Sequence, residues 1–201
     1  MTTIRREITV GAPASSVFAF FVDPALLTRW MGIDADLDAR PGGLFRVNIN
    51  ATMVVTGAYR TIDAPRRVVF TWGWDGQDNA VPPGSSEVEV TLREINGATL
   101  VAIEHRGLPD DDAVKGHTEG WDHYLERFAA VASGGDPGPD PWVSPSSQCR
   151  AVARERRAAP TSGHRCRRRA AARRGAIPRR SRTPRDRRAP SSTPTPAVPG
   201  S

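Results

Sequence analysis

One stretch of this chain, residues 110–133, has sustained helical periodicity and constrains the fold more than any other stretch. Its large side chains recur every three or four residues, which places them on one stripe of an α-helix. They are Val114, His117, Trp121, Leu125, Phe128 and Ala132. Charged residues occupy the opposite face, three aspartates begin the stretch, and Gly134-Gly135 ends it. A long amphipathic helix of this kind needs an apolar surface to lie on.

Almost everything before this helix predicts strands. Alternation of apolar and polar side chains indicates six of them, over residues 3–10, 44–49, 53–62, 67–74, 86–94 and 99–106. Two short helices, over 17–22 and 25–30, follow the first strand, and Ser15 or Ser16 is the expected cap of the first helix. Antiparallel strands covered by one long helix make an α+β domain. A single helix on a strongly bent sheet leaves room for a cavity between the two.

Several pieces of the sequence, taken in order, resemble a known group of proteins. They are ITVGAPASSVFAFFVDPALLTRWMG, RPGGLFRV, VTGAYRTIDAPRRVVFTWGW, TLVAIEHRGLP, HTEGWDHYLERF and GGDPGPDPW. Over residues 1–142 this set resembles the START-like (SRPBCC) helix-grip superfamily, in its branch related to activators of heat-shock-protein ATPase. The resemblance implies a curved antiparallel sheet of about seven strands around the C-terminal helix, enclosing a cavity.

The same resemblance implies a range of functions. Members of the superfamily bind lipids, sterols, polyketides and hormones, and a minority are cyclases or other enzymes. The pattern is a signature of fold and cavity rather than of catalysis, so a function does not follow from it directly.

The charge is divided unevenly between two parts of the chain. Residues 1–142 carry 12 basic and 20 acidic side chains, a net charge of −8, whereas residues 143–201 carry 16 and 2, a net charge of +14. All tryptophans, phenylalanines and tyrosines lie in the first part, so we predict one folded domain there. The second part lacks Leu, Phe, Met, Tyr and Trp, which predicts a disordered tail rich in Arg, Pro and Ala.

This tail has two interpretations. Its arginines can contact nucleic acid, but only non-specifically, because no aromatic residue is interleaved for base stacking. Its composition is also what GC-rich DNA encodes in a wrong reading frame. Our hypothesis is that residues 143–201 are frameshifted sequence without a selected function.

Several classes of protein and site are not predicted. The sequence has no run of about 18 apolar residues and no apolar leader segment, so we expect a cytoplasmic protein with no membrane partner. Cys149 and Cys166 lie in the tail, outside any C-x-x-C spacing, which argues against a disulfide or zinc site. Residues 1–142 contain no P-loop, G-x-G-x-x-G or Ser-His-Asp order, so we predict no cofactor, no metal and no defined catalytic group.

Aromatic and histidine side chains are the candidates to line the cavity. They are Trp30, Tyr59, Trp72, Trp74, His105, His117, Trp121 and Tyr124. Indoles offer large apolar faces and one N–H donor, which suits a small hydrophobic or aromatic ligand. Trp72 and Trp74 end a strand before a loop and are the best candidates for the mouth of the cavity. Each tryptophan could equally be ordinary core, and each histidine an ordinary hydrogen-bonded residue.

Three functions fit these residues. The first is binding of a small hydrophobic or aromatic ligand without defined catalysis. The second is a cyclase- or hydrolase-like enzyme that uses His117, Tyr124 or His105 for proton transfer. The third is a chaperone-accessory interaction module, which the resemblance implies. A homodimer is compatible with all three.

Other residues of the long helix carry smaller expectations. His123 points away from the apolar stripe, so we expect it to be solvated. Each glycine inside a helix costs about 1 kcal/mol relative to alanine. For Gly120 we expect a close approach of the backbone to the sheet or to a ligand, and for Gly116 the sequence leaves the reason open.

Overall fold

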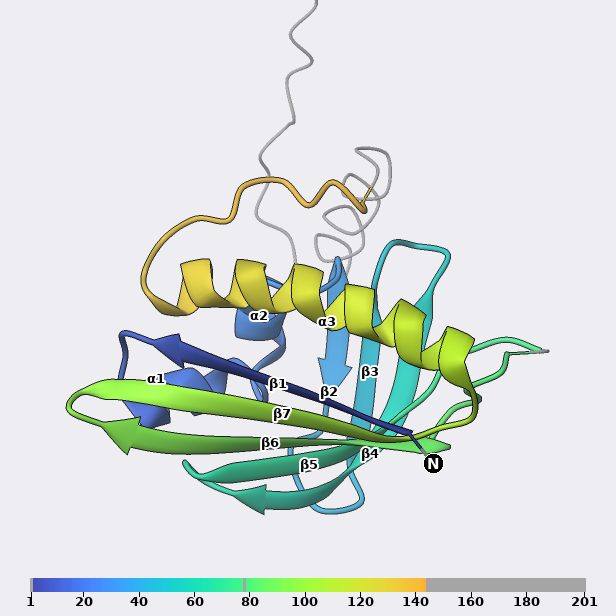
Figure 1. Cartoon of the computed structure of the whole chain (residues 1–201), viewed down its shortest axis with the longest axis horizontal. Helices are drawn as coiled ribbons and strands as arrows, with labels where there is room; N and C mark the ends of the chain where they lie inside the picture. The colour runs from blue at the N-terminus through green and yellow to red at the C-terminus, as the bar shows by residue number, and fades with distance from the viewer. Residues whose placement is uncertain (1, 78, 144–201) are drawn as a thin grey trace, which may run out of the picture. The chain divides into compact units, whose positions relative to one another are not determined.

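The computed structural model describes residues 2–77 and 79–143, in which one long helix crosses one face of a curved sheet (Figure 1). The strands are β1 (Thr2–Val10), β2 (Asp34–Leu37), β3 (Leu44–Asn48), β4 (Val54–Asp63), β5 (Arg67–Trp72), β6 (Ser86–Ile95) and β7 (Ala98–Leu108). The helices are α1 (Ala14–Ala19), α2 (Pro24–Leu27) and α3 (Asp111–Ala132). The predicted tail lies outside these residues, apart from Val143.

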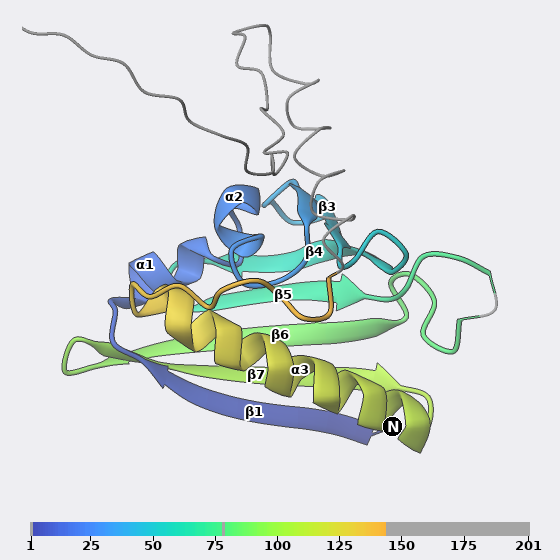
Figure 2. The same cartoon turned by 90° about the horizontal axis from the view of Figure 1, so that it is seen from above.

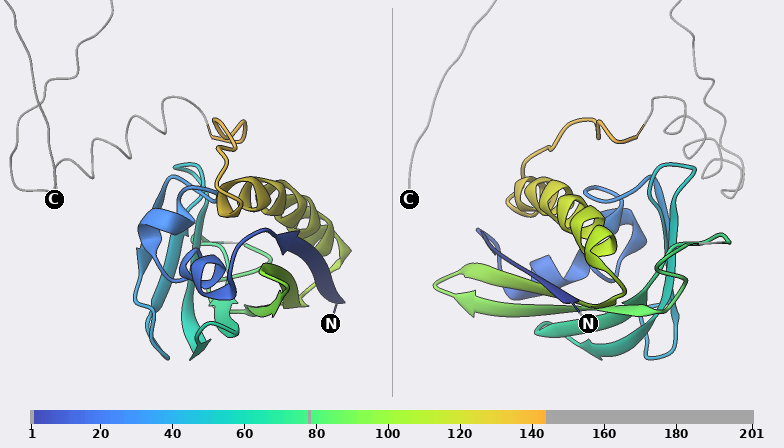
Figure 3. Two further views of the ribbon diagram at one scale, coloured as in Figure 1. Left: turned by 90° about the vertical axis from the view of Figure 1, so that its left-hand side faces the viewer. Right: turned by 45° about the vertical axis from the view of Figure 1, so that its right-hand side comes forward.

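The seven strands form a single sheet in the order β1-β7-β6-β5-β4-β3-β2, and every neighbouring pair is antiparallel. Pairing of β1 with β7 places the first strand beside the last one, directly under α3. The sheet curves around this helix (Figure 3). The predicted α+β helix-grip fold is therefore confirmed. Within the described residues, no helix is long and apolar enough to cross a membrane.

The long helix matches its prediction closely. Asp110 caps it by accepting a hydrogen bond from the Ala113 amide at 2.7 Å, and Gly134 ends it with a φ of 85°. The predicted stripe faces the sheet. Phe128 is fully buried, and its ring lies 5.0 to 5.7 Å from those of Phe20, Phe21 and Trp30. These aromatic contacts join α3 to the residues that follow each of the two short helices.

The short helices begin differently from the prediction. Helix α1 starts at Ala14, which puts Ser15 and Ser16 inside it, so the predicted serine cap is wrong. Its first amide instead donates to the Glu94 carboxylate, 2.8 Å away on β6. In α2, the carboxylate of Asp23 accepts from two amides of the first turn.

Two features of the sheet differ from the predicted strands. The edge strand β2 was not predicted, because Leu37 is its only large apolar residue. Strand β5 ends at Trp72, and Trp74 forms an isolated bridge with Val55. Gly73 permits this break, since a Cβ atom there would lie 1.8 Å from the carbonyl oxygen of Pro82.

The segment after α3 doubles back along the helix (Figure 2). Asp140 is buried, and its carboxylate accepts hydrogen bonds from His123 Nε2 at 3.0 Å and from the Trp142 amide at 2.9 Å. The Trp142 ring stacks on His123, with the centroids 4.0 Å apart. The expectation that His123 is solvated was wrong, because this segment covers it and leaves 16% of its side chain exposed.

Candidate ligand-binding site

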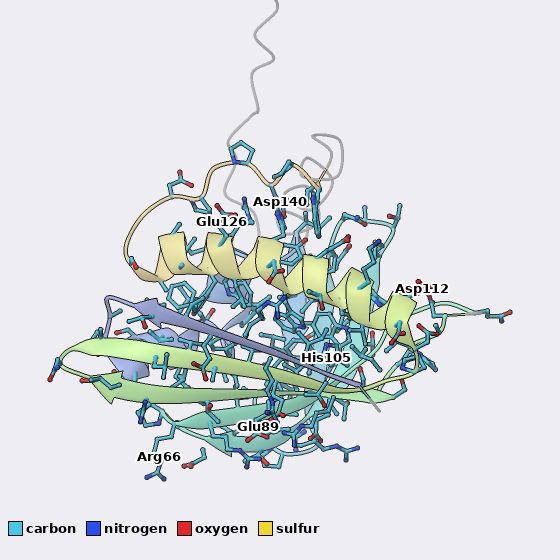
Figure 4. All side chains as sticks on the ribbon, viewed as in Figure 1. Arg66, Glu89, His105, Asp112, Glu126 and Asp140 are labelled. Atoms are coloured by element: carbon cyan, nitrogen blue, oxygen red, sulfur yellow. The ribbon has the colours of Figure 1, made fainter. Side chains whose placement is uncertain are left out.

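Two histidines lie between α3 and the sheet, each hydrogen-bonded to a tryptophan. The fully buried His105 of β7 appears below α3 in Figure 4. Its Nδ1 accepts from the indole N–H of Trp121 at 3.1 Å. The proton must therefore sit on Nε2, which donates to Ser86 Oγ at 2.9 Å, and that hydroxyl donates onward to the Trp72 carbonyl at 3.0 Å.

The second pair is built in the same way with the ring nitrogens exchanged. His117 Nε2 accepts from the indole N–H of Trp74 at 3.2 Å, and Nδ1 donates to the Ala113 carbonyl at 2.7 Å. The two imidazoles are neighbours, with ring centroids 5.0 Å apart and planes at 83°. Both are thereby fixed as neutral rings in defined tautomers.

The pKa values of the two histidines agree with neutral rings. Burial, assisted by the nearby His117, lowers the pKa of His105 to about 3. Burial also lowers the pKa of His117, against the opposing effect of its hydrogen bond to Ala113. A proton on either accepting nitrogen would break the bond to an indole. The cluster is therefore uncharged near pH 7.

A pocket of about 130 Å³ lies beside this cluster, between α3, the hairpin from β3 to β4, and the segment after α3. It is lined by Met31, Ile49, Asn50, Met53, Trp72, Trp74, Gly116, His117, Gly120, Trp121, Tyr124 and Trp142. No Asp, Glu, Lys or Arg is among these twelve residues. Met53 and Trp142 are 43% and 46% exposed, so they form an apolar rim.

The helix wall of the pocket is made by two glycines one turn apart. A Cβ atom on Gly116 or Gly120 would meet no other atom within 4 Å. The expected close approach of Gly120 to the sheet is therefore absent. The missing side chains instead leave the space that the pocket occupies.

Two polar atoms of the lining residues have no hydrogen-bond partner within the described part of the chain, although both are buried. They are the indole nitrogen of Trp72 and the hydroxyl of Tyr124. Burial raises the pKa of Tyr124, and the Asp140 carboxylate raises it further, through its charge and a weak interaction with the tyrosine hydroxyl, against the opposing charge of Arg127. The tyrosine therefore stays protonated and keeps an O–H to donate.

The structure brings five of the eight predicted residues together around the pocket. They are Trp72, Trp74, His117, Trp121 and Tyr124. His105 lies behind Trp121 and orients it. Trp30 and Tyr59 do not line the pocket: the Trp30 indole donates to the Phe20 carbonyl at 3.4 Å, and the Tyr59 hydroxyl to that of Phe21 at 2.8 Å. Both are core residues that tie the short helices to the rest.

The remaining lining residues were not predicted as such. Met31 and Asn50 lie outside the predicted helices and strands, whereas Ile49 ends the predicted strand 44–49 and Met53 directly precedes β4. Trp142 had a signal, because it is the last aromatic residue before the tail. Within residues 2–77 and 79–143, no group of three His, Cys, Asp or Glu side chains could hold a metal ion.

Known proteins resemble this chain in sequence and in fold. Residues 11–133 match the family described as Activator of Hsp90 ATPase homolog 1-like protein. The solution structure of an AHSA1-like protein from Rhizobium etli is 44% identical and superposes with a TM-score of 0.57, covering 70% of this chain and 87% of that one.

Two further relatives are more distant. The crystal structure of an Hsp90 activator from Plasmodium falciparum is 20% identical with a TM-score of 0.55, covering 65% of this chain and 96% of that one, and it supports the fold alone. An uncharacterized protein from Schizosaccharomyces pombe is 26% identical over 131 residues, 64% of this chain. The match spans only 36% of that curated relative's length.

Proposed function

Because this chain belongs to the Activator of Hsp90 ATPase homolog 1-like protein family, we propose that it uses the fold of that family to bind one small hydrophobic or aromatic molecule, without defined catalysis. The observation that carries this proposal is the apolar pocket whose helix wall is built from Gly116 and Gly120. Each glycine disfavours the helix by about 1 kcal/mol relative to alanine. A gap held open at that cost is more consistent with a binding site than with a packing fault.

The size of the pocket limits the ligand. An apolar protein cavity of about 150 Å³ accepts benzene, and this pocket measures about 130 Å³. The pocket is therefore sized for a single aromatic ring, and a small substituent would have to lie toward the exposed rim. The exposed side chains of Met53 and Trp142 provide an apolar entrance.

The expected affinity is modest. Burial of roughly 200 Å² of apolar ligand surface, at about 25 cal/mol/Å², contributes about 5 kcal/mol before the costs of association. The dissociation constant is therefore no tighter than roughly 0.2 mM, and the costs of association weaken it further. Binding of such a molecule is reachable without any catalytic step.

Titration of the full chain with toluene, followed in ¹H–¹⁵N NMR spectra, tests the proposal. We expect the backbone amides of Gly116 and Gly120 and the indole N–H of Trp121 to shift in a saturable manner. Gly120→Leu fills the pocket and should abolish these shifts, whereas Glu119→Leu adds the same side chain on the exposed face and should preserve them. Unaltered spectra of the wild-type chain at saturating toluene would refute the proposal.

The enzymatic alternative has weaker support. His117 and His105 each use the lone pair of the unprotonated nitrogen to accept from an indole, and Tyr124 has a raised pKa. None of these groups is free to take a proton in the observed arrangement. A turnover assay in which His117→Gln abolishes activity would favour this alternative.

Family membership is the observation that favours a chaperone-accessory role as the second candidate. The test is whether the purified chain raises the ATPase rate of Hsp90 from its own organism. Stimulation that survives Gly120→Leu would separate this role from pocket binding. The homodimer also stays a prediction, which sedimentation of the full chain can check.

A further inference from the structure

We infer that the pocket selects an uncharged aromatic molecule that carries a hydroxyl group, a phenol, over a plain hydrocarbon or a carboxylate. This inference rests on the proposed function and names the chemical class of its ligand. Three features of the pocket support it: two unpaired polar atoms, the absence of charged side chains from the lining, and the volume.

Two buried polar atoms belong to side chains that line the pocket. Trp72 and Tyr124 are 5% and 6% exposed, and both line the pocket. The Trp72 indole nitrogen and the Tyr124 hydroxyl lack partners within the described residues. A buried polar group without a partner is unfavourable, so native structures almost always satisfy it. Trp72 can only donate, whereas Tyr124 can donate and accept.

A ligand hydroxyl matches this pair of groups. Its oxygen can accept from Trp72 or Tyr124, and its hydrogen can be donated to the Tyr124 oxygen. A hydrocarbon would leave both groups unpaired. Discrimination of this kind is strong, because a site with polar groups rejects an analogue that cannot pair with them.

The electrostatics of the lining disfavour anionic ligands such as carboxylates. Among the described residues the lining contains no cationic side chain, and its histidine, His117, is neutral with its accepting nitrogen bonded to Trp74. The charge of Asp140 outweighs that of Arg127 in its effect on the pKa of Tyr124, so an anion beside that tyrosine would meet a like charge. A carboxylate ligand would lose its hydration on entering the pocket, and no positively charged side chain of the lining would offset that cost. Phenols remain uncharged at pH 7, as tyrosine does.

The unpaired hydroxyl of Thr56 provides a matched control. It is buried and without a partner within the described residues, but Thr56 lies on β4 and does not line the pocket. Thr56→Val and Tyr124→Phe therefore remove the same kind of group at two places. Only the second should affect ligand choice.

Binding of phenol, toluene and benzoate to the full chain, measured by NMR titration, tests the inference. We expect phenol to bind the wild-type chain roughly five- to tenfold more tightly than toluene, the effect of one net hydrogen bond, and benzoate at least tenfold more weakly than phenol. Tyr124→Phe should lower the ratio of phenol affinity to toluene affinity by roughly five- to tenfold, the effect of one net hydrogen bond. Thr56→Val should change neither. Anisole, which accepts but cannot donate, should fall between phenol and toluene in the wild-type chain.

The outcomes separate this inference from the proposed function. Toluene binding more tightly than phenol, with no effect of Tyr124→Phe, would overturn the phenol assignment and leave the apolar binding site intact. Benzoate as the tightest ligand would overturn it as well. Failure of all three compounds to bind would overturn both. The wild-type series of phenol, anisole and toluene decides the matter even if a variant fails to fold.

Discussion

The two tyrosines of the chain are both buried, yet their hydroxyls have opposite situations. Tyr59 donates to the Phe21 carbonyl at 2.8 Å, whereas Tyr124 makes no hydrogen bond of normal geometry within the described residues and interacts only weakly with Asp140. We predict that Tyr59→Phe lowers the free energy of unfolding by about 1 kcal/mol, the usual net value of a hydrogen bond. Tyr124→Phe should leave it unchanged or raise it slightly. Urea denaturation of both variants measures this difference, and equal losses would contradict it.

The paired histidines predict an acid-sensitive fold. The pKa of His105 is about 3 in the folded chain and about 6.5 when unfolded. Below pH 6.5 the unfolded chain therefore binds a proton that the folded chain does not, and stability falls as the pH falls toward 3. The slope is about 1.4 kcal/mol per pH unit for one such proton. The lowered pKa of His117 adds to the loss in the same direction.

A variant isolates the contribution of His105. His105→Gln has no titrating ring, so its unfolding free energy should depend on pH less steeply between pH 6 and 4, by about 1.4 kcal/mol per unit. Urea denaturation at several pH values measures both slopes. Identical slopes in variant and wild type would show that His105 does not titrate as its burial requires.

At the scale of elements, the glycines divide into two kinds. A Cβ atom on Gly57 of β4 would lie 1.8 Å from the Thr71 carbonyl oxygen, whereas one on Gly120 would meet nothing. We predict that Gly57→Ala destabilises the fold by more than about 2 kcal/mol, because backbone must shift. Gly120→Ala should stabilise it by up to about 1 kcal/mol. Thermal unfolding compares the two, and destabilisation by Gly120→Ala would mean that its space is not open.

The elements also show how far the sequence can be interpreted alone. The 3.6-residue period of α3 and the alternation in β5 to β7 predicted these elements within a few residues, because each buries one regular face. Strand β2 and the position of His123 could not be predicted in this way. The strand depends on pairing with β3, and the histidine is covered by a segment that folds back from residues 136–142. Both result from tertiary contacts rather than from local pattern.

The candidate site was likewise predictable only where its residues follow a local pattern. The tryptophans and His117 were predicted because strand and helix periods point them inward. Assignment of Trp30 and Tyr59 to a cavity was not supported by their positions, since type and burial alone do not distinguish core from lining. The role of the two glycines required the distances to surrounding atoms, which no sequence pattern contains.

For the whole molecule, we predict that the folded domain needs nothing beyond the segment after α3. A chain that ends at Val143 keeps Asp140 and Trp142, which cover His123. Trp142 also forms part of the pocket rim. Its free energy of unfolding and its affinity for toluene should equal those of the full chain within error. A loss of more than about 1 kcal/mol, measured by urea denaturation, would assign a structural role to residues 144–201.

The central claim is that one small aromatic molecule occupies the pocket beside Gly120. The most direct measurement is an isotope-filtered NOE spectrum of the ¹³C,¹⁵N-labelled full chain with saturating unlabelled toluene. Our account predicts NOEs from the ring protons of the ligand to the α-protons of Gly116 and Gly120 and to the indole of Trp121, all lost in Gly120→Leu. Saturating ligand without these NOEs, or with NOEs that persist in Gly120→Leu, would contradict it.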